Sequence, residues 1–421
     1  MKIIENKINR IRNLKAKPRV LDLFAGCGGI SLGFHAAGFE IKGAIEYDEH
    51  AAKTHACNFH AYTENFEDHS KAIDITKVDP DEYVSRLFPY ETQEECFDII
   101  VGGPPCQAFA RVGRAKLREV SEHPEAFLQD PRSNLYLRYL QYVAKLKPIA
   151  LLMENVPDVL NFGGHNIAEE VCEVLSSYGY ICKYTLLNSV YYGVPQMRER
   201  MILVAYSKEI CSDFEFPPKP SHWIDLPVGY HGSRQVAMQT LRNDLFTNQK
   251  YFVQPPSKSG NEKAAVTAHD AIGDLPTITD HLKGKLKRGA RRFDTLIKYD
   301  GRKKESEYAH QLKKWENFQS NGGIKDHVIR YLPRDYKIFA QMKPGDQYPE
   351  AHKTAIHMFE KALSQLKTKP TEGSDAYKEL WENFVPPYSP NKFPNKWRKM
   401  EVDQPARTLM AHLGKDSYSH I

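Results

Sequence analysis

Residues 19–29, RVLDLFAGCGG, decide the fold of this chain because they join a short apolar run to a glycine-rich loop. The run from Arg19 to Phe24 predicts a buried strand, and the amphipathic segment from Ile30 to Ala37 predicts a helix. Glycines let the backbone approach a ligand closely, and the helix N-terminus adds N–H donors. The stretch therefore predicts a ligand loop between a strand and a helix, although a plain tight turn has a similar composition.

Strands and helices continue to alternate through the first half of the chain. The apolar residues of Leu135–Leu146 have helical spacing and predict a helix. The further strand candidates are Phe39–Ile45, Phe97–Val101, Ile149–Met153, Tyr184–Leu187 and Met201–Ala205. Such alternation predicts an α/β fold with a mostly parallel sheet and helices on both faces. Ligands of such sheets bind at the carboxyl ends of the strands.

Chemically useful residues follow several of these strand candidates. Glu46 ends the second strand, where a carboxylate can accept hydrogen bonds from a ribose diol. Residues 102–107, GGPPCQ, follow the third, and the Pro-Pro pair stiffens the chain just before Cys106. A cysteine held in a ligand cleft needs only a modest drop in pKa to act as a nucleophile, but a structural cysteine is also compatible with this pattern.

Two more motifs complete the set. In MENV, residues 153–156, Glu154 follows a strand and is expected to face Cys106, unless it is a helix cap or a surface charge. In QMRER, residues 196–200, Arg198 and Arg200 have the spacing of side chains on one side of an extended segment. A salt-bridged strand edge would also explain these two arginines.

The bulk properties limit the class of protein. The 421 residues carry a net charge of +5, and 41% of them are hydrophobic, as in ordinary globular proteins. No apolar run approaches the roughly 18 residues of a membrane-spanning helix, and the N-terminus has no signal-peptide core, so we expect a cytoplasmic location. The seven cysteines show no C-x-x-C spacing, which argues against a zinc site or a disulfide framework. We expect no bound metal.

The second half of the chain has a different composition. Ala205 is followed by the proline-rich stretch FEFPPKPSHWIDLP, and the chain is then polar and basic with interleaved aromatic residues. Ten basic residues against two acidic ones lie between His281 and Lys304, so the positive charge is concentrated there. This run favours a polyanion contact, although a solvated basic loop is the alternative.

The order of these motifs is more specific than any one of them. DLFAGCGG, GGPPCQ, ENV and QMRER, followed by DQPARTL at residues 403–409, resemble the DNA (cytosine-5) methyltransferase family, bacterial restriction–modification type. The resemblance implies an S-adenosylmethionine-dependent, Rossmann-like sheet domain at residues 1–206. It further implies a second, smaller target-recognition domain at 207–400 and the return of the ninth conserved block at 401–421.

The resemblance also assigns roles in catalysis. The Cys106 thiolate would add to C6 of a flipped-out cytosine in duplex DNA, and Glu154 would engage N3 and the exocyclic amine. Arg200 would contact O2, Arg198 would support the site, and Asn155 would orient the loop that carries Glu154. Carbon 5 would then accept the methyl group, and loss of its proton would release the cysteine.

The S-adenosyl-L-methionine site carries over in the same way. Phe24 would pack beside the adenine, Tyr47 would cover it, and Asp74 would accept from its amino group. Glu46 would bind the ribose, and the glycine loop would approach the methionine moiety. The full set implied by the resemblance is Phe24, Ala25, Gly26, Gly28, Glu46, Tyr47, Asp74, Ile75, Pro105 and Leu135.

Contacts with duplex DNA are expected from the segment between Gln107 and Asp130, which the family uses as a loop that closes over DNA. Positive side chains near the reactive cysteine suit phosphate contacts, which position the duplex without reading its sequence. The residues implied are Gln107, Arg111, Arg114 and Lys116, while the sequence would be read by residues of the 207–400 region.

The pattern departs from the family in one place. The tenth block, an Asn-rich helix that folds back on the cofactor domain, is not found after the ninth. We therefore expect either a truncated chain or a second polypeptide that supplies this part. Two alternatives stay open: a DNA-binding subunit that is inactive without its partner chain, and an RNA cytosine-5 methyltransferase.

Overall fold

The computed structural model describes residues 2–105, 135–161, 165–227, 249–277, 289–293, 295–320, 322–325, 327–392, 394 and 397–408. The chain divides into two compact units. The first contains Met1–Asn188, Glu199–Pro220 and Asp225–Ser259, and the second contains Ser189–Arg198, Ser221–Ile224 and Gly260–Ile421. The segment Ser189–Arg198 thus belongs with the C-terminal part of the chain.

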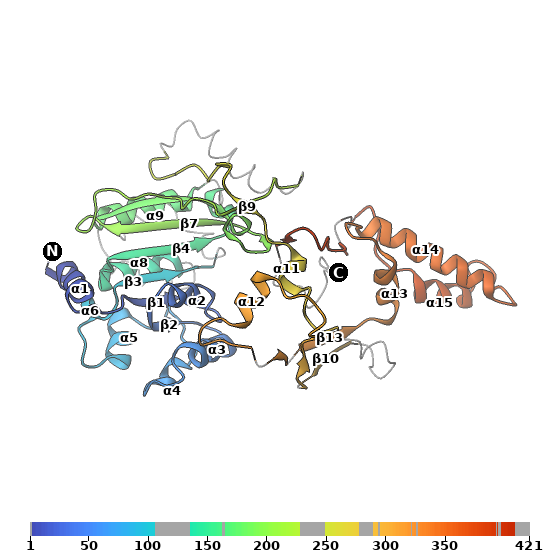
Figure 1. Cartoon of the computed structure of the whole chain (residues 1–421), viewed down its shortest axis with the longest axis horizontal. Coiled ribbons are helices and arrows are strands. Elements are labelled where there is room, and N and C mark those ends of the chain that lie inside the picture. The colour runs from blue at the N-terminus through green and yellow to red at the C-terminus, as the bar shows by residue number, and fades with distance from the viewer. Residues whose placement is uncertain are drawn as a thin grey trace. The chain divides into compact units, whose positions relative to one another are not determined.

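A six-stranded sheet forms the centre of the first unit (Figure 1). Its order is β2 (Glu40–Ile45), β1 (Arg19–Leu23), β3 (Ile99–Gly102), β4 (Ala150–Asn155), β7 (Glu199–Ser207) and β5 (Tyr180–Asn188). The first four strands are parallel, and β7 runs antiparallel to both β4 and β5. The predicted α/β fold with a mostly parallel sheet is confirmed.

Alternating side chains of these strands enter two apolar clusters, one on each face of the sheet. Leu21 and Leu23 of β1 belong to the larger cluster, together with side chains of α5 (Pro80–Leu87), α8 (Leu135–Leu146) and α9 (Ile167–Ser177). Val20 points the other way, toward a smaller cluster lined by α2 (Gly29–Ala36) and α3 (Glu49–Phe59). This two-sided burial is the physical reason why the strands read as continuous apolar runs.

The remaining helical elements in the described part of the first unit are short, apart from the first. They are α1 (Lys2–Asn13), α4 (Phe66–His69), α6 (Gln93–Cys96) and the 3-10 helix η4 (Pro157–Asn161). Helix α8 has the bounds that its apolar spacing predicts, and α2 differs from its prediction by one residue at each end.

The antiparallel direction of β7 matters for the site. The parallel strands β1 to β4 end at one edge of the sheet, and β7 begins at that same edge. In the register of the two strands, Glu154 is opposite Ile202 and Asn155 is opposite Met201. The start of β7 therefore lies beside the end of β4.

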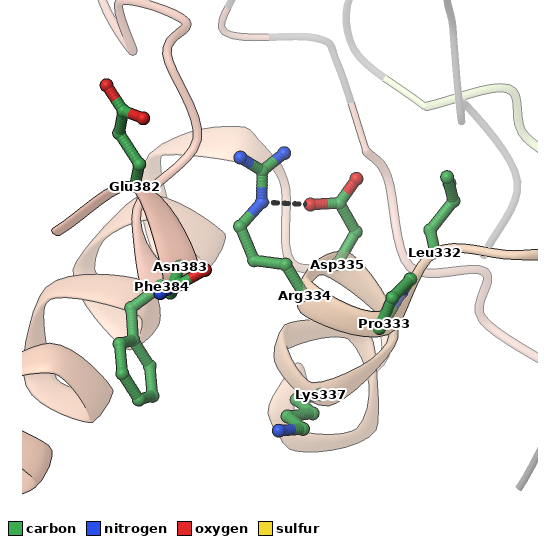
Figure 2. Close-up of a pocket in the computed structure, with 8 residues that line it drawn as sticks. All are labelled: Leu332, Pro333, Arg334, Asp335, Lys337, Glu382, Asn383 and Phe384. Atoms are coloured by element: carbon green, nitrogen blue, oxygen red, sulfur yellow. Dashed lines mark hydrogen bonds and ion pairs between the residues drawn. The ribbon is translucent and has the colours of Figure 1, made fainter. Parts of the chain in front are cut away.

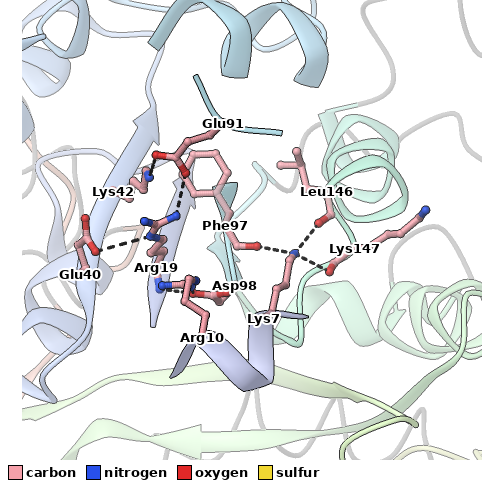
Figure 3. Close-up of polar contacts among 10 residues, drawn as sticks. All are labelled: Lys7, Arg10, Arg19, Glu40, Lys42, Glu91, Phe97, Asp98, Leu146 and Lys147. Carbon is pink, nitrogen blue, oxygen red and sulfur yellow. Dashed lines mark hydrogen bonds and ion pairs between the residues drawn. The ribbon is translucent and has the colours of Figure 1, made fainter. Parts of the chain in front are cut away.

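Helix α1 is hydrogen-bonded at the opposite edge of the sheet, where the parallel strands begin (Figure 3). The buried ammonium of Lys7 donates to the carbonyls of Phe97, Leu146 and Lys147 at 2.7, 2.8 and 2.8 Å. Arg10 of the same helix forms an ion pair with Asp98, which precedes β3. Helix α1 thus binds the beginnings of the central strands and the end of α8.

The second unit contains short strands and two groups of helices. Its elements are η5 (Ser189–Tyr192), β6 (Gln196–Met197), β8 (His222–Trp223), β9 (Lys263–Ala264), α11 (Ala268–Ile272), β10 (Gly289–Phe293), β11 (Ile297–Lys298), α12 (Glu307–Lys313), β12 (Gly323–Ile324), β13 (His327–Tyr331), α13 (Pro333–Gln341), α14 (Tyr348–Gln365), α15 (Asp375–Phe384) and β14 (Ala406–Arg407). Helices α13 to α15 enclose a core of their own around Trp397.

Two sequence motifs meet inside this second unit. The short strand β14, from DQPARTL, runs parallel to β6, from QMRER, with Ala406 opposite Gln196. The Thr408 hydroxyl donates to the Met197 carbonyl at 2.8 Å. Residues far apart in the chain are therefore joined by backbone pairing at this place.

Candidate active site

The end of β4 and the start of β7 present one acidic and one basic side chain to each other. Glu154 Oε1 lies 2.7 Å from Arg200 Nε, and their side chains are 30% and 18% exposed. The Arg200 guanidinium also donates to the Glu199 carbonyl at 2.6 Å, which fixes its plane. A half-buried, charge-assisted pair of this kind presents both polar groups at the ligand edge of the sheet.

Asn155 joins this pair to the neighbouring strand. Its side-chain amide donates to the Pro104 carbonyl at 2.8 Å, and its Oδ1 accepts from the Val156 amide at 2.9 Å. The side chain is buried, so these bonds do not compete with bulk water. Asn155 therefore fixes the loop that follows β3 to the loop that follows β4.

The glycines of the GGPP loop are required by close contacts. A Cβ on Gly102 would lie 2.4 Å from the Leu23 backbone oxygen, and a Cβ on Gly103 would lie 3.0 Å from Glu154 Oε2. The loop after β3 and the Glu154 carboxylate are thus in direct contact. Pro105, the last residue described before the gap, is exposed. The predicted nucleophile Cys106 lies outside the described residues.

Arg198 is separated from Arg200 by the break between β6 and β7. Its amide donates to the Gln196 carbonyl at 3.0 Å, and its carbonyl accepts from the Ser189 amide at 2.9 Å. Arg198 belongs to the second unit, whereas Arg200 belongs to the first. Its supporting role in the site stays a prediction.

The glycine-rich loop after β1 has the backbone conformation that its composition predicts. Gly26 and Gly28 have positive φ angles of 55° and 96°, and Phe24 also has a positive φ of 62°. A Cβ on Gly28 would lie 2.5 Å from Phe59 Cε2 and 3.0 Å from His55 Cδ2. A side chain at Gly28 is therefore excluded both by conformation and by space.

Glu46 holds the same loop from the end of the neighbouring strand. Its Oε2 accepts from the Gly26 amide at 2.7 Å, and its Oε1 accepts from the Asp48 amide at 2.8 Å. Each carboxylate oxygen keeps further lone pairs for a ligand hydroxyl. The predicted ribose acceptor and the predicted methionine loop are thus adjacent.

The other predicted cofactor residues lie around this loop. Ile75 and Ala25 are buried, whereas Tyr47 is 75% exposed. Phe24 and Leu135 are partly buried against the large apolar cluster. Tyr47 is the most exposed of these side chains, so its ring is free to cover a ligand.

Asp74 has the charge state expected of an acceptor. The amide and hydroxyl of Thr76 donate to its Oδ1 at 3.0 and 2.7 Å, and Lys77 lies 3.5 Å from its Oδ2. Burial raises the pKa of Asp74, but the Thr76 hydrogen bonds and Lys77 outweigh burial and hold that pKa below its ordinary value. The carboxylate is therefore ionised near neutral pH.

Sequence reasoning missed a polar group directly behind the loop. Asp22, in the middle of the apolar strand β1, is fully buried, and its Oδ2 accepts from the Ser31 hydroxyl at 2.6 Å. Ser31 Oγ is also 2.9 Å from His55 Nε2. An acidic residue within an apolar run is the one signal in the sequence that pointed to such a buried network.

Several predicted DNA-contacting residues cannot be placed. Gln107, Arg111, Arg114 and Lys116 lie outside the described residues, as do Lys283, Lys285, Lys287 and Arg288 of the basic run. The described part of that run includes the exposed Arg302, which binds Asp300 with two hydrogen bonds of 3.0 Å.

A separate cavity of about 340 Å³ lies in the second unit, between the beginning of α13 and the end of α15 (Figure 2). Arg334 lines it and forms an ion pair of 2.6 Å with Asp335, while Glu382 faces the same space. Its described lining contains none of the predicted catalytic or cofactor residues.

Comparison with known proteins gives the site its context. Residues 18–379 match the model of the family described as C-5 cytosine-specific DNA methylase. The type II methyltransferase M.OihORF3336P of Oceanobacillus iheyensis is 34% identical over 97% of this chain and 84% of its own length. The type II methyltransferase M1.HphI of Haemophilus parahaemolyticus is 30% identical over 80% of this chain and 84% of its own length.

A third relative, type II methyltransferase M.AgeI of Thalassovita gelatinovora, is 26% identical over 94% of this chain and 85% of its own length.

Within the described part of the chain, no helix is both long and apolar enough to span a membrane. The family match covers most of the chain, including both the glycine loop and the Glu154–Arg200 pair. The chain therefore belongs to the C-5 cytosine-specific DNA methylase family and is a DNA cytosine-5 methyltransferase that uses S-adenosylmethionine.

Proposed function

We propose that this enzyme methylates C5 of a flipped-out cytosine in a specific duplex DNA sequence through a covalent bond between Cys106 and C6 of the base. The observation that carries the proposal is the contact between the Glu154 carboxylate and the loop that leads to Cys106. Its relatives are named type II methyltransferases, which supports a role as the modification enzyme of a restriction–modification pair.

The residues around the glycine loop fit S-adenosylmethionine. Phe59 and His55 leave no room for a side chain at Gly28, and the Glu46 carboxylate, which binds the Gly26 amide, offers further lone pairs beside the loop. We assign Phe24, Tyr47, Asp74 and Ile75 to the adenosine, with Ala25, Gly26, Pro105 and Leu135 completing the pocket. When bound, the cofactor supplies an electrophilic methyl group.

The chain's own residues prepare the base to accept that methyl group. The Cys106 thiolate forms a bond to C6, and electron density then collects at C5 and N3. Glu154 accepts a hydrogen bond from the exocyclic amine with one carboxyl oxygen and gives a proton to N3 from the other, and Arg200 donates to O2, so both stabilise the negative charge that develops in the ring. After C5 has gained the methyl carbon, it loses its proton to water. The electron pair of the C5–H bond then forms the C5–C6 double bond, and the C6–sulfur bond breaks to regenerate the thiolate.

The pairing of Glu154 with Arg200 supports these roles. Without substrate, each charge neutralises the other in a half-buried place. A cytosine edge offers an amine donor to the carboxylate and a carbonyl acceptor to the guanidinium, so it complements both partners. Asn155 would hold the two loops at the separation that this exchange needs.

DNA contacts complete the proposal. We assign phosphate contacts to Gln107, Arg111, Arg114 and Lys116, and sequence recognition to the 207–400 region, which follows the 1–206 catalytic domain. An extrahelical cytosine is required because C5 and C6 are covered by stacking within the duplex.

A trapping experiment tests this function. The full chain is incubated with S-adenosylmethionine and a pool of duplexes that carry 5-fluorocytosine in many sequence contexts. Fluorine at C5 cannot leave as the proton does, so the enzyme should remain bonded to the base. We expect a denaturant-resistant adduct that disappears in Cys106→Ser and persists in Cys211→Ser, the matched control.

Two other outcomes of the trapping experiment would contradict the proposal. An adduct that forms with RNA but not with DNA would assign the activity to an RNA substrate. A folded chain that binds duplex DNA without forming an adduct would contradict catalysis by this chain alone, and a subunit that needs a partner polypeptide would replace it. Sequencing of the trapped duplexes identifies the recognised site.

A further inference from the structure

Three buried polar side chains form a continuous chain behind the glycine loop. Asp22 of β1, Ser31 of α2 and His55 of α3 are all at most 1% exposed. The Ser31 hydroxyl lies 2.6 Å from Asp22 Oδ2 and 2.9 Å from His55 Nε2. These three elements are the strand that enters the loop, the helix that leaves it and the helix packed beneath it.

The first link holds the first turn of helix α2. Gly28, the N-cap of α2, has no side chain to bind the free amides of the first helical turn. The Ser31 hydroxyl in this first turn donates to Asp22 Oδ2. The carboxylate therefore fixes the beginning of α2, which is also the end of the glycine loop, relative to β1.

The second link is the hydrogen bond between Ser31 and His55, whose ring packs against Gly28 of the loop. The His55 ring lies so close to Gly28 that an added Cβ would be 3.0 Å from its Cδ2. The same ring contacts Ser31 through Nε2. His55 therefore both supports Gly28 by contact and holds Ser31 by a hydrogen bond.

The direction of the hydrogen bonds follows from the charge states. Burial raises the pKa of Asp22 to about 7, so the carboxylate is an acceptor at pH 8. Burial lowers the pKa of His55 to about 4, so its ring is neutral. The single Ser31 hydroxyl proton then goes to Asp22, and His55 donates to Ser31 from Nε2.

We infer that Ser31 and His55 are positioning residues for the cofactor, and that their hydrogen bonds to each other and to Asp22 hold the glycine loop in its ligand-binding conformation. This inference rests on the proposed cofactor role of the loop. None of the three side chains touches the reacting atoms. Their effect is expected in cofactor affinity rather than in the chemical step.

Two substitutions at one position separate hydrogen bonding from packing. His55→Phe keeps a ring beneath Gly28 but removes the donor to Ser31, whereas His55→Gln keeps a side-chain N–H donor without the ring. Ser31→Ala removes both links of the chain. His50→Gln changes an exposed imidazole on the first turn of α3 and is the matched control.

The readout is the dissociation constant for S-adenosylhomocysteine, measured by calorimetry on the full chain at pH 8. We expect His55→Phe and Ser31→Ala to weaken binding about 10-fold, the size of one or two lost hydrogen bonds. His55→Gln and His50→Gln should stay within about threefold of the wild type. Turnover at saturating cofactor, and duplex DNA affinity, should change little.

Other results overturn the inference. If His55→Phe binds the cofactor normally and His55→Gln does not, packing alone positions the loop. If the variants only lower the melting temperature and leave cofactor affinity unchanged, the chain is structural. A wild type that binds cofactor but forms no adduct in the trapping experiment contradicts the proposed reaction and leaves this inference intact. A wild type that binds no cofactor overturns both.

Discussion

The carboxylate of Glu154 lies 2.7 Å from the guanidinium of Arg200, at the point where β4 ends and β7 begins. The two residues meet because β7 runs antiparallel to β4 and so starts at the edge where the parallel strands end. The GGPP loop reaches the same point, since Gly103 faces Glu154 Oε2. The antiparallel strand thus completes a site that the parallel strands alone would leave without its basic side chain.

Replacement of Glu154 by Gln tests the carboxyl group at this point. Glutamine keeps the shape but cannot give a proton to N3, so it stabilises the negative charge of the activated cytosine less well. We expect methyl transfer in single-turnover assays to fall on the order of 100- to 1000-fold, with cofactor affinity unchanged. Glu173→Gln, an exposed change on α9, is the control. Activity of Glu154→Gln within threefold of wild type would remove Glu154 from the catalytic set.

Replacement of Gly102 by Ala tests the close approach of β3 to β1. The new Cβ would lie 2.4 Å from the Leu23 backbone oxygen, which cannot rotate away. We expect the free energy of unfolding to fall by about 1–3 kcal/mol, measured by urea denaturation. An unchanged unfolding midpoint would show that the two strands separate without cost.

Gly103→Ala is the informative partner of that substitution. Its Cβ would lie 3.0 Å from Glu154 Oε2, the mobile end of a side chain, so stability should change by less than about 1 kcal/mol. The displaced carboxylate would no longer meet the cytosine correctly, and we expect methyl transfer to slow roughly 10- to 100-fold. Wild-type turnover with a normal melting temperature would contradict this assignment.

Helix α1 offers a test of stability without chemistry. Lys7 is 1% exposed and donates to three carbonyls at the edge opposite to the site. Lys7→Met keeps much of the volume but leaves those carbonyls without this donor, so we expect a loss of about 2–4 kcal/mol. The melting temperature should fall while turnover of the folded enzyme stays normal. Lys2→Met, an exposed change on the same helix, should alter neither.

Periodicity predicted the strands and helices of the first unit well, but it missed what tertiary partners decide. The predicted strand Tyr184–Leu187 extends in fact from Tyr180 to Asn188. Lys183 interrupts the apolar pattern, yet it is accommodated because its ammonium binds Asp213 at 2.7 Å and lies over the Phe214 ring. Such partners are distant in sequence and leave no local signal.

The sequence predicted which residues belong to the site better than it predicted how they are arranged. The motif order identified Glu154, Arg200 and the glycine loop, but no spacing in the sequence specifies that β7 is antiparallel. The same holds for Ser31 and His55, whose polarity alone does not show that they meet Asp22 inside the protein. Pairings between elements, rather than the elements themselves, are what the sequence leaves open.

Three buried histidines make stability depend on pH. Burial lowers the pKa of His55, His60 and His69 to about 4, 2 and 4, from an ordinary value of 6.5. The unfolded chain therefore binds protons below pH 6.5 that the folded chain does not, and stability present above pH 6.5 is lost as the pH falls. Asp22 acts in the opposite sense, since its pKa is raised to about 7 and the folded state binds its proton first.

The net difference is two protons between about pH 6 and pH 4.5, because Asp22 offsets one of the three histidines. This predicts a fall in the free energy of unfolding of roughly 3 kcal/mol per pH unit, measured by urea denaturation at several pH values. His60→Gln removes one titrating ring and should reduce that slope by about 1.4 kcal/mol per unit. His50→Gln should leave the slope unchanged. If His60→Gln shows the same slope as the wild type, the buried His60 imidazole is already protonated in the folded enzyme. The rings of His60 and His69 are stacked with 3.7 Å between their centroids, so this charge would then need a counter-charge nearby.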